Sequence, residues 1–329
     1  MKLSSIKLFV IIFTLSVLQL SFSSNTAFAQ TKSGKYTIVI HGGAGTISKN
    51  LPDSVKKAYT DALTHALKIG QDILAKGGKS IDAVEAVIQY FETDPKFNSG
   101  IGAVFTADGK HELDACVMLG QDLSTGAVAG VKHIAHPIKL AKMVMEKTPH
   151  VLFAGEGADQ LGKKFGLKWV DNSYFDTPHR KAAWEKWKAK MDKEKHGTVG
   201  CVCLDQYGNL AAGTSTGGLT GKMPGRVGDS PIVGAGTYAN NKTCGISGTG
   251  TGELYIRHNL AYNISALMQY KGYTLQQAED EMIHKVLSPG DGGVIGVDKD
   301  GNYAFSFNTE GMFRGVATSS GKFEVKIWQ

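Results

Sequence analysis

The chain has 329 residues, of which 42% are hydrophobic and 20% are charged, with a formal net charge of +6 and 41 glycines. This composition is typical of a globular protein with a large core, and it excludes low-complexity, collagen-like and disulfide-scaffold proteins. The charge is small and dispersed, so it does not indicate nucleic-acid binding. Length alone allows one or two domains.

The first 29 residues have the pattern of a signal peptide. Lys2 and Lys7 precede an apolar run over Leu8–Leu20, and a polar stretch then ends in Ala27-Phe28-Ala29. A basic start, a short apolar run and an A-x-A site are the features of a secretory signal, and the run is shorter than the ~20 residues that a spanning helix needs. We therefore expect residues 1–29 to be removed and the protein to be periplasmic or secreted, with no membrane attachment afterwards.

The first half of the remaining chain mixes short strands with amphipathic helices. Helices are predicted from apolar residues at helical spacing, and the second of them is expected to be capped by Ser80. A hairpin is predicted around Asp108-Gly109 because such a turn often joins two strands. In chain order we expect a strand over Tyr36–Ile40, helices over Asp53–Lys76 and Ser80–Phe91, hairpin strands over Ala103–Thr106 and Glu112–Met118, and helices over Ile138–Glu146 and Val151–Phe165.

A charged segment at about 171–197 separates the two halves. Within it, Arg180–Lys195 holds seven basic and three acidic residues, and its large apolar side chains are Trp184 and Trp187. Such a run is usually solvated surface. It predicts either a solvated helix or a linker, and not a nucleic-acid patch.

The second half is richer in strands. We expect a strand pair over Thr198–Leu204 and Leu210–Thr216, a second pair over Ile232–Tyr238 and Thr243–Ser247, helices over Glu253–Tyr270 and Leu275–Val286, and strands over Gly293–Val297, Tyr303–Phe307, Gly315–Thr318 and Phe323–Ile327. Strands and helices that come in blocks indicate an α+β fold with antiparallel sheets and outer helices.

Several familiar motifs occur only in incomplete form. Residues 213–217 fit G-x-S-x-G, but the glycines and Pro224 that follow cannot start the helix that this nucleophile motif requires. Lys222 follows a glycine as in a phosphate loop, yet Met223 replaces the Ser or Thr that would bind magnesium. His133 and His136 have metal-like spacing without an evident third ligand.

The four cysteines show no zinc or redox spacing. Cys201 and Cys203 lie two apart in a predicted strand, so they share a face and are poorly placed to bond each other, while Cys116 and Cys244 lie in distant apolar segments. We expect all four to behave as small buried hydrophobic residues.

One constellation points to chemistry, and it lies at Gly197-Thr198. Thr198 follows a glycine at the start of a hydrophobic strand and behind a charged segment. A threonine hydroxyl is a poor nucleophile, but cleavage of the 197–198 bond would free an α-amine with a pKa of about 7.7–8.0 that can accept the hydroxyl proton. Gly197 would let the backbone bend for that attack. The segment therefore fits one of two interpretations: an ordinary threonine at a strand start, which is the commoner case on propensity alone, or self-cleavage that makes Thr198 an N-terminal nucleophile.

Around Thr198 the chain resembles the plant-type asparaginase/isoaspartyl peptidase family. Eight blocks occur in the family's order and span most of the chain: His41–Gly45, Phe97–Phe105, Glu112–Met118, Gly197–Gly200, Thr214–Gly218, Pro224–Pro231, Gly248–Glu253 and Phe307–Met312. The resemblance implies an N-terminal nucleophile hydrolase with an αββα sandwich, in which two antiparallel sheets pack between helical layers. It implies one αβ domain cleaved into an α chain (30–197) and a β chain (198–329).

The resemblance also implies the activity, which is hydrolysis of L-asparagine and of β-aspartyl (isoaspartyl) dipeptides to release L-aspartate. By position, Thr198 is the nucleophile, Thr216 orients its hydroxyl, and Thr249 and Gly250 match the oxyanion hole. Arg226 and Asp229 match residues that hold the free amino-acid end of the substrate. The remaining implied site residues are Val227, Gly228, Thr251 and Gly252 in the pocket and Asn98 close to the nucleophile.

These roles agree with the chemistry of a zwitterionic substrate. A guanidinium is a natural bidentate partner for its α-carboxylate, an aspartate complements its α-ammonium, and alternating Gly and Thr can present N–H groups to an oxyanion. The bland alternative is a local ion pair between Arg226 and Asp229.

The same resemblance implies no catalytic cofactor and a structural sodium ion. The ion would be held by main-chain carbonyl groups, which suit a hard cation, and the implied donors are Phe91, Glu92, Asp94, Phe97, Ser99 and Ile101. Small-molecule substrates and an (αβ)2 heterotetramer are also implied.

Two alternatives remain open from the sequence. The glycosylasparaginase branch removes sugars from asparagine but typically has Asp before the nucleophile, where this chain has Gly197. A catalytically idle binding protein could share the fold, although the intact set of threonines with Arg226 and Asp229 argues against it.

Overall fold

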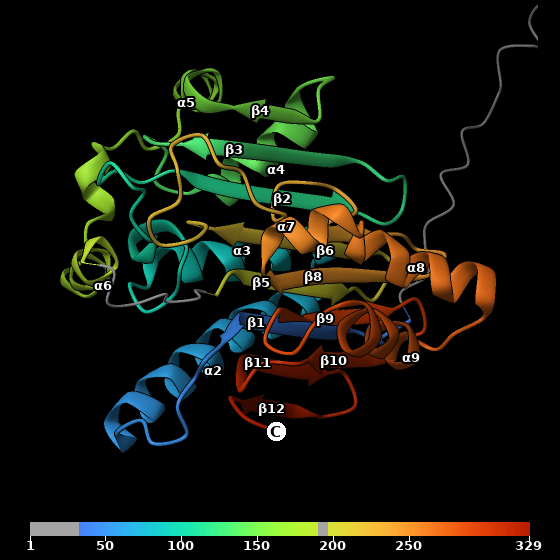
Figure 1. Ribbon diagram of the computed structural model, residues 1–329. Coiled ribbons are helices and arrows are strands. Elements are labelled where there is room, and N and C mark those ends of the chain that lie inside the picture. The colour runs from blue at the N-terminus through green and yellow to red at the C-terminus, as the bar shows by residue number, and fades with distance from the viewer. Residues whose placement is uncertain (1–32, 190–196) are drawn as a thin grey trace, which may run out of the picture. The chain divides into compact units, whose positions relative to one another are not determined.

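The computed structural model of the uncleaved chain describes residues 33–189 and 197–329. The predicted signal peptide, residues 1–29, and the end of the charged segment at 190–196 lie outside the described residues. Two sheets, of eight and four strands, form the centre of the described structure, and helices lie around them (Figure 1). The α+β class expected from the block pattern is thus confirmed.

The larger sheet joins segments from both halves of the sequence. Its strands run in the order β12-β11-β1-β5-β6-β2-β3-β4, and neighbours are antiparallel except β3 and β4, which are parallel. Their bounds are β1 Thr37–Gly45, β2 Leu113–Leu119, β3 Thr125–Val131, β4 Leu152–Ala154, β5 Val199–Leu204, β6 Leu210–Thr216, β11 Gly311–Thr318 and β12 Phe323–Lys326. This order places β1, β5 and β6 side by side in the middle of the sheet.

The smaller sheet is antiparallel and runs in the order β10-β9-β8-β7. Its strands are β7 Thr237–Ala239, β8 Cys244–Gly250, β9 Gly292–Asp298 and β10 Tyr303–Phe307. Contacts of β8 with β5 and β6, and of β9 with β1 and β5, show that it packs face to face on the centre of the larger sheet.

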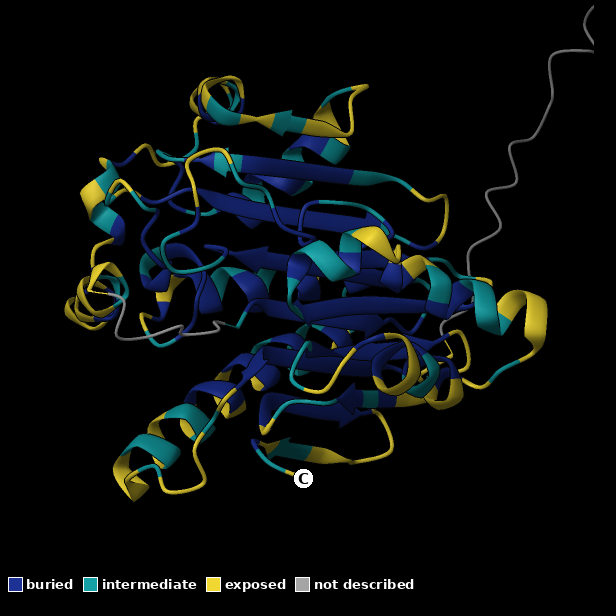
Figure 2. Ribbon diagram, in the orientation of Figure 1, coloured by how far each residue is buried: buried dark blue, intermediate teal, exposed yellow. Residues whose placement is uncertain are grey.

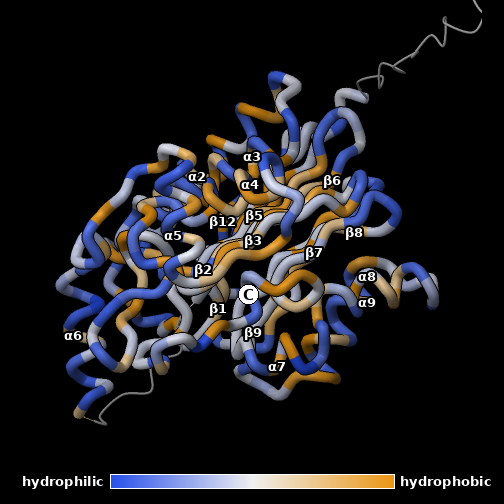
Figure 3. The backbone as a smooth tube through the Cα atoms, turned by 90° about the horizontal axis from the view of Figure 1, so that it is seen from above, coloured by the Kyte–Doolittle hydropathy of each residue, from blue (hydrophilic) through white to orange (hydrophobic). Residues whose placement is uncertain are grey.

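Helices cover the outer face of each sheet. The larger sheet carries α2 Asp53–Ala75, α3 Ser80–Thr93, α4 Pro137–Lys147 and α5 Gly155–Lys164, while α7 Gly252–Arg257, α8 Leu260–Lys271 and α9 Leu275–Asp280 lie by the smaller sheet. Figure 3 shows α3 and α4 on one side of the strands and α7, α8 and α9 on the other. Within the described residues, no helix combines the length and apolarity needed to cross a bilayer.

The central strands are buried on both faces and therefore serve two cores (Figure 2). Alternate side chains of a strand point to opposite faces. On β5, Cys201 and Cys203 lie in the core beneath the helices, whereas Val202 and Leu204 lie in the core between the sheets. All four cysteines are buried, which confirms the expectation that they behave as small hydrophobic residues. The sulfurs of Cys201 and Cys203 lie 3.6 Å apart.

The predicted hairpin at Asp108-Gly109 is wrong. The turn itself exists, since the Gly109 N–H donates to the Thr106 carbonyl at 3.0 Å, but Ala103–Thr106 forms no strand. Strand β2 pairs instead with β6 and with β3, a strand that the sequence analysis missed. The physical reason is that Phe105 packs on the Trp184 ring, with centroids 5.5 Å apart, so tertiary packing holds this segment as a loop.

Five other boundaries differ from expectation. Ser80 is the first residue of α3 rather than its cap, and its N–H donates to the Asp205 carboxylate at 2.9 Å. The helix expected over Glu253–Tyr270 breaks at Asn259, which has a φ of 45°. The segment 151–165, expected to be a helix, begins as strand β4. The segment 232–238, expected to be a strand, is one only at its end, and the helix that begins at Leu275 becomes a π-helix over Glu281–Val286.

Part of the charged segment is a helix. Helix α6 (Pro178–Lys188) is capped by Thr177, whose side chain accepts the Arg180 N–H at 3.3 Å. Its tryptophans dock on glycines, because a Cβ built on Gly221 would lie 1.9 Å from the Trp187 ring and one on Gly109 2.9 Å from the Trp184 ring. Of the two readings of this segment, the helix is confirmed for 178–188.

A buried carboxyl group on α9 gives a testable stability prediction. Glu279 is 0% exposed, neither of its oxygens has a partner among the described residues, and burial raises its pKa well above the usual value. The folded state therefore retains a proton that the unfolded chain loses near pH ~4.3, so the free energy of unfolding falls as pH rises toward the folded-state pKa. We expect Glu279→Met to add about 1–4 kcal/mol at pH values above that pKa.

Thermal unfolding of wild type and Glu279→Met at acidic and alkaline pH checks this. The gain in Tm should be larger at alkaline pH, and the variant's Tm should depend less on pH. Glu281→Met is the matched control, because Glu281 is half-buried and paired with Lys285 at 2.6 Å. A lower Tm for Glu279→Met at both pH values would show that the carboxyl group stabilises the fold.

Candidate active site

Strands β5 and β6 bring two predicted catalytic threonines together. Thr198 directly precedes β5, and Thr216 is the last residue of the neighbouring strand β6, where Val199 pairs with Ser215. The Thr198 hydroxyl donates to Thr216 Oγ1 at 3.1 Å, and Thr216 Oγ1 also accepts the Gly218 N–H at 3.0 Å. Both threonines are buried. Thr216 thus fixes the direction of the Thr198 hydroxyl.

Thr249 contacts the same residue from the other sheet. Its hydroxyl oxygen, on β8, accepts the Thr198 N–H at 3.1 Å and the Ala44 N–H at 3.3 Å. Because the oxygen accepts twice, its own hydrogen is left to donate. The sequence placed Thr249 in the oxyanion hole but did not show that its hydroxyl holds the Thr198 nitrogen, since the packing of β8 on β5 decides that contact.

Gly197 and Gly43 allow two backbones to touch beside Thr198. A Cβ built on Gly197 would lie 2.4 Å from Gly43 Cα, and one on Gly43 would lie 2.5 Å from Gly197 Cα. Gly43 also has a φ of +110°, which favours glycine. The glycine-rich end of β1 is therefore shaped around the predicted cleavage site.

Arg226 and Asp229 lie near each other, with Gly252 beside both. A Cβ built on Gly252 would lie 2.7 Å from Asp229 Oδ1 and 3.1 Å from Arg226 Nη2. The local Arg226–Asp229 ion pair considered from the sequence is not found among the described residues. Arg226 Nε and Nη2 instead donate to the two carboxylate oxygens of Glu253, each at 2.9 Å.

Glu253 is a residue that the sequence analysis did not single out. It closes the quoted block Gly248–Glu253, and an acidic residue at the start of α7 is the signal that could have drawn notice. Its carboxylate binds the edge of the guanidinium that carries Nε and Nη2. Nη1 makes no contact with Glu253. It lies next to Gly228, since a Cβ built on that glycine would be 2.8 Å from Nη1. Glu253 therefore orients Arg226.

Two buried groups near the site have strongly shifted pKa values. Burial raises the pKa of Asp229, which is 5% exposed and has an unpartnered Oδ2 among the described residues, to about 7. Burial lowers the pKa of His41 to about 3, so this ring is neutral, and its Nε2 lies 3.0 Å from Ser247 Oγ.

The other predicted site residues surround this centre. Asn98 shapes the loop after Thr216, because its Nδ2 donates to the Gly218 carbonyl at 2.7 Å and its Oδ1 accepts the Val104 N–H at 3.0 Å. The Thr251 N–H donates to the Asp291 carbonyl at 2.8 Å, and a Cβ on Gly250 would lie 2.1 Å from that oxygen. Val227 and Gly228 connect Arg226 to Asp229.

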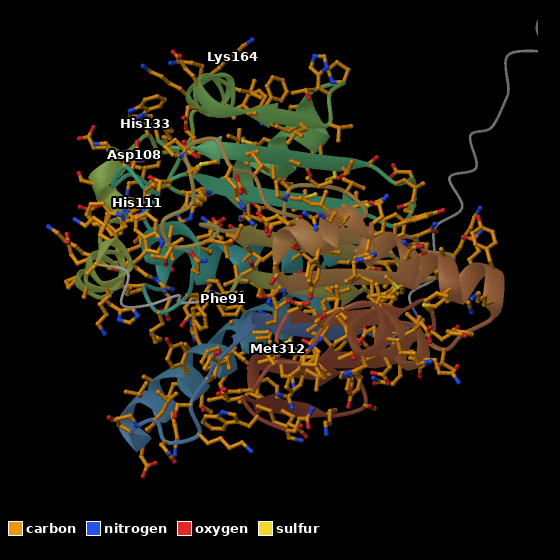
Figure 4. The ribbon with its side chains drawn as sticks, in the orientation of Figure 1. Phe91, Asp108, His111, His133, Lys164 and Met312 are labelled. Atoms are coloured by element: carbon orange, nitrogen blue, oxygen red, sulfur yellow. The ribbon has the colours of Figure 1, made fainter. Side chains whose placement is uncertain are left out.

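The incomplete motifs have structural uses. Ser215 points away from Thr198 and donates to Glu92 Oε1 at 2.7 Å, while the buried Lys222 amine donates to the Glu112 carbonyl at 2.8 Å. His133 stacks on Trp169 with centroids 4.6 Å apart, and Figure 4 shows it beyond β3, far from β5. Across residues 33–189 and 197–329, no three His, Cys, Asp or Glu residues gather as a metal site.

Comparison with known proteins agrees with this arrangement. The model of a family described as Asparaginase matches residues 34–327. The chain belongs to this asparaginase family.

Relatives within the family cover nearly the same length. The isoaspartyl peptidase of Salmonella typhimurium is 47% identical over 295 residues, which span 85% of this chain and 94% of that protein. The isoaspartyl peptidase/L-asparaginase of Homo sapiens is 41% identical over 291 residues, 84% of this chain and 91% of that protein. A probable isoaspartyl peptidase/L-asparaginase of Arabidopsis thaliana is 42% identical over 326 residues, which cover 90% of this chain and 100% of the relative. The family expected from the sequence blocks is confirmed.

Proposed function

We propose that this asparaginase-family chain is a self-cleaving threonine hydrolase that converts L-asparagine and β-aspartyl dipeptides to L-aspartate. One observation carries the proposal: the hydroxyl and the nitrogen of Thr198 are held by Thr216 and Thr249, each at 3.1 Å. A bystander threonine at a strand start needs neither contact. The names of the relatives support the substrate class.

Maturation begins in the uncleaved chain. The Thr198 hydroxyl attacks the Gly197 carbonyl, the peptide C–N bond breaks, and the acyl group passes from nitrogen to oxygen as an ester. Water then hydrolyses the ester, which leaves a carboxylate on Gly197 and a free amine on Thr198. The products are the α chain, residues 30–197, and the β chain, residues 198–329.

Turnover uses both groups of Thr198. The α-amine accepts the hydroxyl proton while Oγ1 attacks the β-carbonyl carbon of the substrate. The resulting oxyanion is met by the Thr249 hydroxyl hydrogen and by backbone N–H groups near Gly250. The C–N bond breaks, ammonia or an amino acid leaves with the proton from the α-ammonium, and water releases L-aspartate from the acyl-enzyme. The neutral His41 is not the base, because burial lowers its pKa to about 3, which is too low for it to take a hydroxyl proton near neutral pH.

Arg226 and Asp229 hold the substrate's free amino-acid end. The guanidinium binds the α-carboxylate on the edge that Glu253 leaves open, and Asp229 binds the α-ammonium through its unpartnered Oδ2. An ammonium group would satisfy this buried oxygen, which is expensive to leave unpaired. Binding at this end places the side-chain amide at Thr198.

The layered fold supports assignment to the N-terminal nucleophile hydrolases with an αββα sandwich. The same family membership supports an (αβ)2 heterotetramer. The signal sequence at residues 1–29 supports a periplasmic or secreted location, where the enzyme would scavenge aspartate from exogenous amides.

The loop around Asn98 fits the implied sodium ion. Two main-chain oxygens lie very close to glycines in this loop. A Cβ built on Gly100 would be 2.0 Å from the Glu92 carbonyl oxygen, and one built on Gly102 would be 2.0 Å from the Phe97 carbonyl oxygen. The acidic side chains there have other partners: Glu92 accepts from Ser215 and Asp94 pairs with Lys96. Main-chain oxygens therefore remain as the donors, which suits a hard cation. The ion would order the loop that carries Asn98.

The pKa of Asp229 predicts how product binding depends on pH. Below about pH 7 the carboxyl group is protonated and cannot pair with an α-ammonium, so affinity for L-aspartate should fall about tenfold per pH unit below that value and level off above it. The competitive inhibition constant of L-aspartate, measured between about pH 5.5 and pH 8.5, checks this. Asp229→Asn should show weak binding without the pH dependence. A wild-type inhibition constant that is constant across this range would contradict the role of Asp229.

Mass spectrometry with an ammonia-release assay tests the proposed function. Purified protein should consist of two chains with Thr198 at the start of the second, and it should release ammonia from L-asparagine and leucine from β-Asp-Leu. A single uncleaved chain without activity would instead indicate a binding protein on this fold. Preference for glycosylated asparagine would indicate the glycosylasparaginase reaction.

A further inference from the structure

A cavity of about 340 Å³ lies beside Gly197. Its walls include the glycine-rich end of β1 at 42–45, Asn98 and Gly197 itself, but neither Arg226 nor Asp229. The volume falls within the range of small-molecule sites, roughly 300–1,000 Å³. This cavity is therefore distinct from the end of the site that holds the aspartyl half of the substrate.

One part of the cavity wall is apolar. It is formed by Ile47, Leu51, Val55, Tyr59 and Phe313. Tyr59 and Phe313 are stacked with ring centroids 4.3 Å apart, which gives this wall a flat, rigid surface. Such a wall suits an aliphatic or aromatic side chain.

Another part of the wall is basic. Lys96 and Arg180 belong to it, and the described lining residues include no aspartate or glutamate. The Lys96 ammonium is 2.8 Å from Asp94 Oδ1 outside the cavity, and an ammonium has three donors to distribute. Arg180 is buried and donates its Nε to the Gly102 carbonyl at 2.7 Å. This wall suits a carboxylate.

Gly197 connects the cavity to Thr198. It lines the cavity and is bonded to Thr198 in the uncleaved chain. Self-cleavage breaks that bond, so the Gly197 end can withdraw and the cavity can open onto the new N-terminus. The aspartyl half of a substrate is held by Arg226 and Asp229, and the leaving half must extend away from them.

We propose that this cavity is the leaving-group subsite for β-aspartyl dipeptides. It takes the amino acid whose amine is released when the isopeptide C–N bond breaks and Thr198 Oγ1 takes the acyl group. Lys96 binds that amino acid's free α-carboxylate, Arg180 adds positive charge to the lining, and the wall around Tyr59 and Phe313 contacts its side chain. The subsite rests on the proposed function and adds to it a basis for preferring dipeptides over L-asparagine, whose leaving group is ammonia.

The test compares three substrates on the mature enzyme: β-Asp-Leu, β-Asp-Leu amide, in which the α-carboxylate is neutral, and L-asparagine. Wild-type kcat/KM should be about five- to tenfold higher for β-Asp-Leu than for its amide. Lys96→Met should shrink that ratio toward one and lower kcat/KM for β-Asp-Leu more than for L-asparagine. Lys57→Met is the matched control, because Lys57 is exposed on α2, does not line the cavity, and pairs with Asp61 at 2.7 Å.

The outcomes separate the two proposals. The subsite is wrong, and the proposed function is unaffected, if wild type hydrolyses β-Asp-Leu and its amide equally well. The same holds if Lys96→Met leaves the ratio of the two kcat/KM values unchanged. If the cleaved protein hydrolyses neither the dipeptide nor L-asparagine, both the proposed function and the subsite are wrong. Lys96→Met also removes the ion pair with Asp94 and could disturb the surrounding loop. The comparison of β-Asp-Leu with its amide uses only the wild-type enzyme, so it tests the subsite independently of that variant.

Discussion

Replacing Thr198 with alanine will leave the protein folded, uncleaved and inactive. The variant lacks the hydroxyl that attacks Gly197, so the 197–198 bond persists and the α-amine that serves as base is never freed. We expect kcat/KM to fall by at least about ten-thousandfold. The loss of stability should be only on the order of 1 kcal/mol, because one hydrogen bond to Thr216, of 3.1 Å, is removed at a strand start. A denaturing gel and the ammonia-release assay measure both effects.

Two further substitutions at the same position serve as controls. Thr198→Ser keeps the hydroxyl but loses the methyl group that restrains χ1, so slower cleavage and weaker hydrolysis are expected. Thr198→Cys should cleave, because a thiol is the stronger nucleophile, while hydrolysing amides poorly. The appearance of two chains in Thr198→Ala would remove Thr198 as the nucleophile and end the proposed mechanism.

Replacing Arg226 with alanine should separate maturation from turnover. Self-cleavage involves Gly197 and Thr198 and not the substrate's α-carboxylate, so two chains should still form. The kcat/KM for L-asparagine should fall by about a hundredfold or more, mainly through KM. The reason is that Arg226 and the substrate's α-carboxylate form a buried charge pair, and truncating one partner of such a pair costs about 2–5 kcal/mol. Glu253 loses its partner, but its side chain is 45% exposed and can be solvated, so the fold should survive.

Arg226→Lys is the informative control for that variant. It keeps the positive charge but cannot bind Glu253 and a substrate carboxylate with two edges of one planar group. We expect it to recover only part of the lost affinity. If Arg226→Ala blocked cleavage, the arginine would be required to shape the precursor, and its assignment to substrate binding alone would be wrong.

The proposed chemistry at Thr198 was predicted from local sequence. A glycine before a threonine at a strand start, with a charged segment before it, predicts a cleavage site without any tertiary information. The partners of Arg226 were not predictable in this way. From sequence spacing Asp229 was the natural ion-pair candidate, yet Arg226 pairs with Glu253, 27 positions away, because the start of α7 is folded back over the loop.

The helices and strands show the same contrast between what local sequence predicts and what tertiary packing decides. The sequence determined the helices α2 and α3 and the strands β5 and β6, since their apolar periodicity is strong over many residues. It missed β3, whose small residues carry little pattern and whose strand state comes from pairing with β2. It assigned a strand to 103–106, where packing of Phe105 against Trp184 of α6 decides otherwise.

By itself, the sequence determined the α+β class, because hydrophobic periodicity is encoded within a few positions of the chain. It also determined the family, through sequence blocks that resemble that family, and with it the residue expected to react. Only the tertiary structure decided that Thr249 holds the Thr198 nitrogen, that Asp229 is buried with an open oxygen, and that a cationic cavity lies behind Gly197. Each of these depends on the stacking of two sheets and on segments far apart in the chain. Hydrogen bonding and desolvation act through space, so their consequences appear only once the strands are packed.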